Sequence, residues 1–275
     1  MNNMEIFRET IELFTTDPVY AARTAEACKN TKVYLPGFVS DRQLDADWVC
    51  STGFMSATTL QAAQQAAANG ERTAILCFAN PVHPGGGVTN GARAQEEDIC
   101  RASDLYLCLT HENAASYYAA HRPEFYERDE GWLISSDRVI YTEGCTVIRR
   151  DVCGEKGRWT SERIDEPYTV NVLTCAAPGL FDSILPEEEP EYRAILNGRI
   201  RNILEVALHN RTETLILGAF GCGVFYNPPR IVAQTFHDIL SEERYRKAFR
   251  KVIFAVRPGR MGTDTNTAIF QEFFG

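Results

Sequence analysis

Residues 74–98 of the chain read AILCFANPVHPGGGVTNGARAQEED. The stretch opens with an apolar run of strand length, continues through three consecutive glycines, and ends in the acidic first turn of a helical pattern. Without a Cβ, Gly85, Gly86 and Gly87 let a ligand approach the backbone closely. A strand, a glycine loop and a helix in this order are typical of an open α/β sheet that binds ligands beyond the carboxyl ends of its strands.

The rest of the chain repeats the alternation of strand and helix patterns. Further strands are predicted at residues 33–35, 139–141, 146–148, 168–175, 214–217 and 252–256. Helices are predicted at residues 56–69, 92–110, 192–207 and 232–240. Residues 141–145, YTEGC, predict a tight turn between two antiparallel strands, so the sheet is expected to be mixed. We interpret residues 154–166 and 182–191 as polar excursions from one α/β domain, whose sheet is covered by helices on both faces.

Composition and charge narrow the class of protein. The chain has 275 residues, of which 44% are hydrophobic and 24% charged, and this balance excludes a disordered, collagenous or coiled-coil protein. No stretch approaches the roughly 20 apolar residues of a membrane helix, and the N-terminus lacks a secretory pattern, so we expect a cytoplasmic protein with no membrane partner. The net charge of −9 disfavours direct binding of nucleic acid. The nine cysteines show no C-x-x-C spacing and are expected to be reduced, mostly buried thiols.

A second glycine cluster follows the strand predicted at residues 214–217. Residues 217–229 read LGAFGCGVFYNPP and could hold a diphosphate on backbone N–H groups. The cluster matches neither the dinucleotide fingerprint G-x-G-x-x-G nor the Walker loop. Phe225 and Tyr226 could stack on a sugar or a base, or could pack in the core. The five histidines show no metal-ligand spacing.

Taken together, the residues around the first cluster resemble the signature of the poly(ADP-ribose) glycohydrolase family. The match runs through Phe-Ala-Asn at 78–80, Gly-Gly-Gly at 85–87, seven intervening residues, and Gln-Glu-Glu at 95–97. The second cluster resembles the diphosphate loop of that family, and residues 7–11 resemble the opening of its compact microbial form. The resemblance implies one macrodomain-like domain over residues 1–275, a three-layer α/β/α sandwich with a mixed central sheet and an N-terminal helical extension.

The family resemblance also implies an activity and a site. The activity is hydrolysis of the ribose–ribose bond of poly(ADP-ribose), which releases ADP-ribose without a cofactor or metal. Neighbouring helix positions do not face each other, so Glu96 and Glu97 are expected to have different tasks. Glu97 would protonate the leaving oxygen and then activate water, while Glu96 would hold the leaving ribose through its hydroxyls. The implied substrate-binding residues are Asn80, Gly85, Gly86, Gly87, Val88, Gln95, Gly221, Cys222, Gly223, Val224 and Phe225.

Other functions remain open from the sequence. The substrate could be poly(ADP-ribose) or an ADP-ribosylated protein, and the chain is expected to act as a monomer. One alternative is a macrodomain that binds ADP-ribose without catalysis. Another is a hydrolase of a related ADP-ribose derivative or conjugate. The pair Glu96–Glu97 favours an enzyme, because a binding module needs no paired carboxylates beside the scissile bond.

Overall fold

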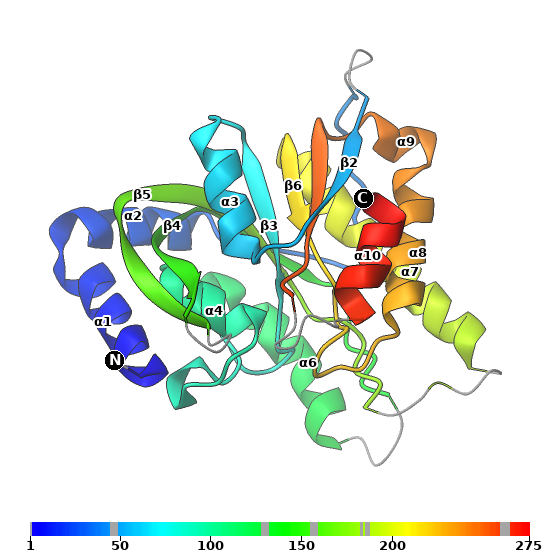
Figure 1. Ribbon diagram of the computed structural model, residues 1–275. Helices are drawn as coiled ribbons and strands as arrows, with labels where there is room; N and C mark the ends of the chain where they lie inside the picture. The colour runs from blue at the N-terminus through cyan, green and yellow to red at the C-terminus, as the bar shows by residue number, and fades with distance from the viewer. Residues whose placement is uncertain are drawn as a thin grey trace.

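The structure, a computed structural model, describes residues 2–44, 49–127, 132–154, 159–181, 184, 188–258 and 265–275. Figure 1 shows how its helices and strands are arranged. The strands are β1 (Lys32–Tyr34), β2 (Ser51–Met55), β3 (Thr73–Phe78), β4 (Val139–Cys153), β5 (Trp159–Cys175), β6 (Thr214–Leu217) and β7 (Lys251–Ala255). The α-helices are α1 (Asn3–Thr16), α2 (Pro18–Lys29), α3 (Thr59–Ala68), α4 (Gln95–Ala102), α5 (Leu105–Thr110), α6 (Ala115–Glu127), α7 (Glu189–His209), α8 (Pro229–Leu240), α9 (Glu243–Arg246) and α10 (Thr265–Phe274).

The seven strands form one mixed sheet in the order β1-β4-β5-β3-β6-β7-β2. β4 runs antiparallel to both of its neighbours, β1 and β5. Every other neighbouring pair is parallel. The carboxyl ends of β5, β3, β6, β7 and β2 therefore lie along one edge of the sheet. The prediction of a mixed sheet is confirmed.

Helices cover both faces of the sheet, as Figure 1 shows with α8 and α10 on one side and α1 and α4 on the other. Alternate residues of β3 supply the two cores, because successive side chains of a strand point to opposite faces. Ala74 and Leu76 pack against α7, α8, α9 and α10, whereas Ile75 and Cys77 pack with α1, α3, α4, α5 and α6. The three-layer α/β/α sandwich expected from the sequence is confirmed.

The tight turn predicted at residues 141–145 is wrong, because β4 continues through it to Cys153. The pairing with β5 is irregular between Thr142 and Cys145, where Gly144 has a φ of +75°. Its N–H donates to Oδ1 of Asn171 on β5 at 3.0 Å. Gly144 thus lies in a β-bulge, and the strand continues in the same direction beyond it.

The helix predicted over residues 92–110 is divided into α4 and α5 at Ser103 and Asp104. The Asp104 carboxylate accepts a hydrogen bond from the Thr146 N–H at 2.8 Å, and the Asp104 N–H donates to the Thr146 carbonyl at 3.3 Å. This pairing to β4 replaces the helical hydrogen bonds that the break removes. This helix break depends on a contact with Thr146, which is distant in the sequence. The periodicity of apolar residues along a helix carries no information about such contacts.

Strand β2 and part of β5 were not predicted. β2 is an edge strand that pairs with β7, and large apolar side chains occur only at its end, at Phe54 and Met55, so it lacks the longer apolar run by which buried strands are recognised. Residues 159–166, interpreted as part of an excursion, belong to β5. The second proposed excursion, 182–191, includes the start of α7 at Glu189. Residues 155–158, 182–183 and 185–187 of these two stretches lie outside the described residues.

Candidate active site

A cavity of about 380 Å³ opens at the edge of the sheet where the carboxyl ends of β3, β6 and β7 meet. Its walls come from the end of β3, the first turn of α4, the segments that follow β5, β6 and β7, and the loop before α3. Ligands of open α/β sheets bind at this edge, and the volume is that of a small-molecule site. Residues of both glycine clusters identified from the sequence line it.

Asn80 sets the direction of the first glycine loop as the chain leaves β3. Its Oδ1 accepts hydrogen bonds from the N–H groups of Val82 at 3.0 Å and His83 at 2.8 Å, which closes an Asx turn. Gly85 and Gly86 then adopt φ values of +69° and +57°, a backbone region that side chains rarely allow. Within the described part of the chain, Nδ2 of Asn80 makes no hydrogen bond, and it can donate to a ligand in the cavity.

Glu97 is held between the start of α4 and the glycine triplet. Its Oε2 accepts from the Ala94 N–H at 2.8 Å, one half of a capping box, because a glutamate at the third helical position reaches back to the helix start. Its Oε1 accepts from the Gly87 N–H at 2.9 Å. The side chain is buried, with 7% of the residue exposed, and it lines the cavity. Two backbone donors thus fix the carboxylate in one orientation.

Glu96 is bound by the loop in the same manner. Its Oε2 accepts from the Asn80 N–H at 2.7 Å, and its Oε1 accepts from the Gly85 N–H at 3.1 Å. Burial raises the pKa of Glu96 well above its ordinary value, and the charge of Glu97 raises it further, while the two backbone donors act in the opposite direction. Glu96 therefore retains a proton to higher pH than an exposed glutamate.

Both carboxylates end beside Gly86. A Cβ on Gly86 would overlap Oε1 of Glu97 and lie 3.1 Å from Oε2 of Glu96. Although adjacent helix positions diverge by about 100°, the two side chains bend back to the same loop and bring their carboxyl groups together. Gly86 lines the cavity, so the closely paired carboxylates are presented there.

Gln95 holds α4 against the sheet. Its Oε1 accepts from the Phe78 N–H at 2.8 Å, and its Nε2 donates to the Leu76 carbonyl at 2.6 Å and to Oγ1 of Thr59 at 3.1 Å. Both hydrogens of the amide are therefore used within the protein. The residue also lines the cavity, and its contacts hold the first turn of α4, which carries the two glutamates.

The second glycine loop, between β6 and α8, is built around the buried Asn227. Its Nδ2 donates to the carbonyls of Pro178 at 2.7 Å and Gly221 at 3.1 Å, and its Oδ1 accepts from the Tyr192 hydroxyl at 2.7 Å. Gly221 has a φ of +72°, and a Cβ there would lie 2.5 Å from both Ala177 and Asn227. The sequence analysis did not identify Asn227, although an asparagine before two prolines marks the end of such a loop.

A third wall of the cavity carries charges that the sequence analysis did not find. Asp98 forms ion pairs with Arg101 and with Arg257, the latter at 3.4 Å. Asp151 on β4 is 8% exposed, and burial together with the charge of Asp98 raises its pKa to about 6. Among these residues, Asp98, Asp151 and Arg257 line the cavity, and only the fold brings the three segments together.

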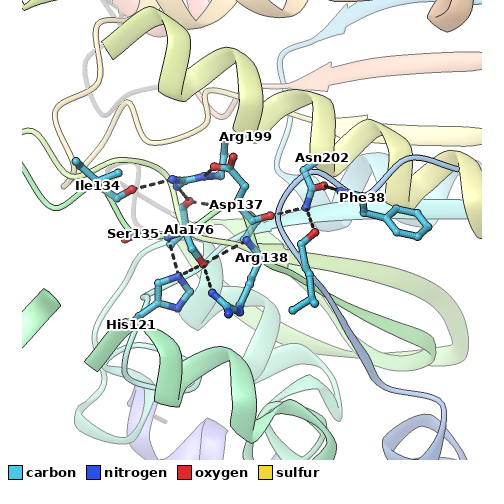
Figure 2. A network of polar contacts seen from close by, with 12 residues as sticks. Phe38, His121, Ile134, Ser135, Asp137, Arg138, Ala176, Arg199 and Asn202 are labelled. Atoms are coloured by element: carbon cyan, nitrogen blue, oxygen red, sulfur yellow. Dashed lines mark hydrogen bonds and ion pairs between the residues drawn. The ribbon is translucent and has the colours of Figure 1, made fainter. Parts of the chain in front are cut away.

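Beneath the second loop, a buried polar network supports the segment that follows β5. Arg199 on α7 is fully buried and donates to Oδ1 of Asp137 at 2.7 Å, to the Ile134 carbonyl at 2.7 Å and to the Ala176 carbonyl. Figure 2 shows Arg199 between Ile134, Asp137 and Ala176. Ala176 precedes the cavity residue Ala177, which a Cβ on Gly221 would meet. The sequence carried one signal for this network, because Arg199 lies on the same face of the predicted 192–207 helix as the apolar Leu196 and Ile203.

The residues predicted for the site divide into two groups. Those that line the cavity are Asn80, Gly86, Gln95, Glu96, Glu97, Gly221, Gly223, Val224 and Phe225. Those that do not are Gly85, Gly87, Val88 and Cys222. Val88 is fully buried and packs in the core, whereas Sγ of Cys222 donates to the Phe220 carbonyl at 3.6 Å. Gly85 and Gly87 act through their N–H groups, which bind the two glutamates.

The described residues contain neither a cluster of metal-ligand side chains nor a membrane-spanning helix. No group of three or more His, Cys, Asp or Glu side chains in these parts of the chain could hold a metal ion. None of the described helices is long and apolar enough to cross a membrane. All nine cysteines lie within the described residues, and none is paired in a disulfide.

Comparisons with known proteins identify the family of the chain. The family model for the catalytic domain of microbial-type poly(ADP-ribose) glycohydrolase (PARG) matches residues 16–150. The PARG structure from Thermomonospora curvata is 32% identical with a TM-score of 0.81, and the alignment covers 99% of each chain. The PARG structure from Deinococcus radiodurans in complex with ADP-ribose is 31% identical with a TM-score of 0.76, and covers 90% of this chain and 95% of that one. No curated protein matches the sequence. On these matches the chain belongs to the microbial type of the poly(ADP-ribose) glycohydrolase family.

Proposed function

We propose that this protein hydrolyses the ribose–ribose bond of poly(ADP-ribose) and releases ADP-ribose, with Glu97 as the general acid and base. The observation that carries the proposal is the pair of buried carboxylates, Glu96 and Glu97, fixed by four backbone N–H groups beside Gly86. Membership of the family and the ADP-ribose complex of the Deinococcus radiodurans relative support the same substrate class.

The first step is the transfer of a proton from Glu97. Burial raises the pKa of the neighbouring Glu96 carboxyl and so favours its uncharged form. Glu97 delivers its proton to the leaving 2′-oxygen while the bond to the anomeric carbon breaks. An oxocarbenium ion remains on the released ribose.

The second step returns the proton. A water molecule attacks the anomeric carbon, and the ionised Glu97 takes a proton from that water. Glu97 is then protonated again, and the products are ADP-ribose and a polymer shortened by one unit. Glu96 holds the hydroxyls of the leaving ribose, and Nδ2 of Asn80 donates to the ribose whose bond breaks.

The second glycine loop provides a site for the diphosphate. Among the described residues, no acceptor binds the N–H groups of Gly221, Gly223, Val224 or Phe225. Backbone N–H groups in a glycine loop bind phosphate oxygens without a cationic side chain, which suits a protein with a net charge of −9. The ring of Phe225, which meets Phe181 edge to face at 6.2 Å, would pack against the distal ribose.

Product analysis tests the proposal. The protein is incubated with poly(ADP-ribose) and, separately, with a protein that carries single ADP-ribose groups, and the products are identified by chromatography and mass spectrometry. We expect free ADP-ribose from the polymer. Binding of ADP-ribose without any product would indicate a binding module, and release only from the singly modified protein would indicate a hydrolase of conjugates.

A further inference from the structure

Three aromatic rings gather at the surface beside the first glycine loop. His83 belongs to that loop, and Phe125 and Tyr126 belong to the last turn of α6. The His83 ring lies 6.0 Å from the Phe125 ring and 6.5 Å from the Tyr126 ring, and the Tyr126 hydroxyl is 3.2 Å from Nε2 of His83. Tyr126 is 64% exposed, so its ring is open to solvent although the neighbouring rings hold its position.

Short contacts connect these rings to the carboxylates. The segment from Asn80 to Gly85 wraps over Glu96, because the N–H groups at its two ends bind the two oxygens of Glu96. His83 lies within this segment, and its N–H donates to Oδ1 of Asn80 at 2.8 Å. The Gly86 N–H in turn donates to the His83 carbonyl at 2.9 Å. The His83 side chain therefore branches from the backbone segment that encloses Glu96, and it lies on the solvent-exposed side of that segment.

The chemistry of the polymer places a purine close to the bond that is cleaved. The leaving oxygen is the 2′-oxygen of an adenosine ribose, and the adenine of that unit is attached to the adjacent carbon. If Glu96 holds the hydroxyls of this ribose, the adenine must lie within a few bond lengths of the Asn80–Gly85 segment. We propose that the exposed Tyr126 ring, which meets the His83 ring at 89° and is held in place by it, is a stacking site for the adenine of the leaving unit, an inference that rests on the proposed function.

A second exposed tyrosine lies on the second glycine loop and serves as the control for the Tyr126 variants. Tyr226 follows Phe225 in the second glycine loop and is 64% exposed, the same fraction as Tyr126. The second loop provides the free N–H groups for the diphosphate of the unit inside the cavity. The two tyrosines thus have the same exposed fraction, and each lies beside one of the two glycine loops. Comparing their alanine variants therefore shows which of the two loops the leaving unit contacts.

The test measures binding without turnover. Each variant is made in the Glu97→Gln background, and affinities are measured for ADP-ribose and for a defined oligomer of two ADP-ribose units. For Tyr126→Ala we expect about tenfold weaker binding of the two-unit oligomer, the effect of losing one base–aromatic stack, with unchanged affinity for ADP-ribose. Tyr126→Phe keeps the ring and should bind both ligands as the parent does. His83→Ala should resemble Tyr126→Ala.

Three results would overturn the inference. These are an unchanged two-unit affinity in Tyr126→Ala, an equal loss for both ligands, or a selective loss in Tyr226→Ala instead. Thermal unfolding of each variant verifies that the fold is intact. Release of ADP-ribose from the polymer by the protein with Glu97 present is measured in parallel, so failure of the proposed function is observed separately from failure of the stacking site.

Discussion

Substitution of Gly86 by alanine tests whether the glycine triplet exists to position Glu97. The added Cβ would overlap Oε1 of Glu97, so the carboxylate must move, and its 2.9 Å hydrogen bond from the Gly87 N–H is disturbed. A displacement of about 1 Å in a reacting group can lower a rate about 100-fold. Because Gly86 has a φ of +57°, the side chain also destabilises the backbone by about 1–2 kcal/mol.

Gly144→Ala is the matched control for backbone strain. Gly144 has a φ of +75° on β4, and no heavy atom lies within 4 Å of the position of an added Cβ. Both variants should lose similar free energy of unfolding in urea, but only Gly86→Ala should lose about 100-fold in kcat for release of ADP-ribose. Near-normal kcat in Gly86→Ala, or equal losses of kcat in both variants, would refute this account of the loop.

Three further predictions concern stability and charge. The pKa of Asp151 is raised by about two units to about 6, so its contribution to stability is present below about pH 4 and is lost as the pH rises through about 6. Asp151→Asn should therefore gain up to about 3 kcal/mol relative to the unsubstituted protein between pH 4 and 8 in urea unfolding, whereas parallel pH curves would contradict the shift. Arg199→Met removes the buried partner of Asp137 and leaves the Ala176 carbonyl without its donor, which should cost about 1–3 kcal/mol, while Arg230→Met, which breaks an exposed pair with Glu272, should change the unfolding midpoint little; equal changes would be inconsistent with a structural role for the network. Raising the salt concentration should weaken binding of the polymer only slightly, and a steep loss would reveal an extended basic groove.

The sequence predicts the parts of the site that are local. Gln95, Glu96 and Glu97 begin α4, as the helical pattern after the glycines indicates, and Glu97 completes a capping box that depends on residues three positions apart. The strand that precedes the loop was recognised because β3 is buried on both faces and is continuously apolar.

The parts that the sequence does not predict depend on contacts between distant segments. Asp151 reaches the cavity only because β4 continues past Gly144, where the sequence suggested a turn. Gln95 lines the cavity, and its amide hydrogen-bonds to the backbone of β3, a partner that periodicity cannot identify. The convergence of Glu96 and Glu97 beside Gly86 likewise requires the loop geometry set by Asn80.

The most direct test of the central claim compares Glu97→Gln with Glu96→Gln in turnover of poly(ADP-ribose), together with the affinity of each variant for ADP-ribose. Glutamine keeps the shape of the side chain but cannot transfer a proton, so we expect Glu97→Gln to lose about 10²–10⁴-fold in kcat and to retain ADP-ribose binding. Glu96→Gln should lose less, because its amide oxygen can still accept hydrogen bonds. Near-normal turnover by Glu97→Gln, or a larger loss in Glu96→Gln, would contradict the assignment of Glu97 as the group that transfers the proton.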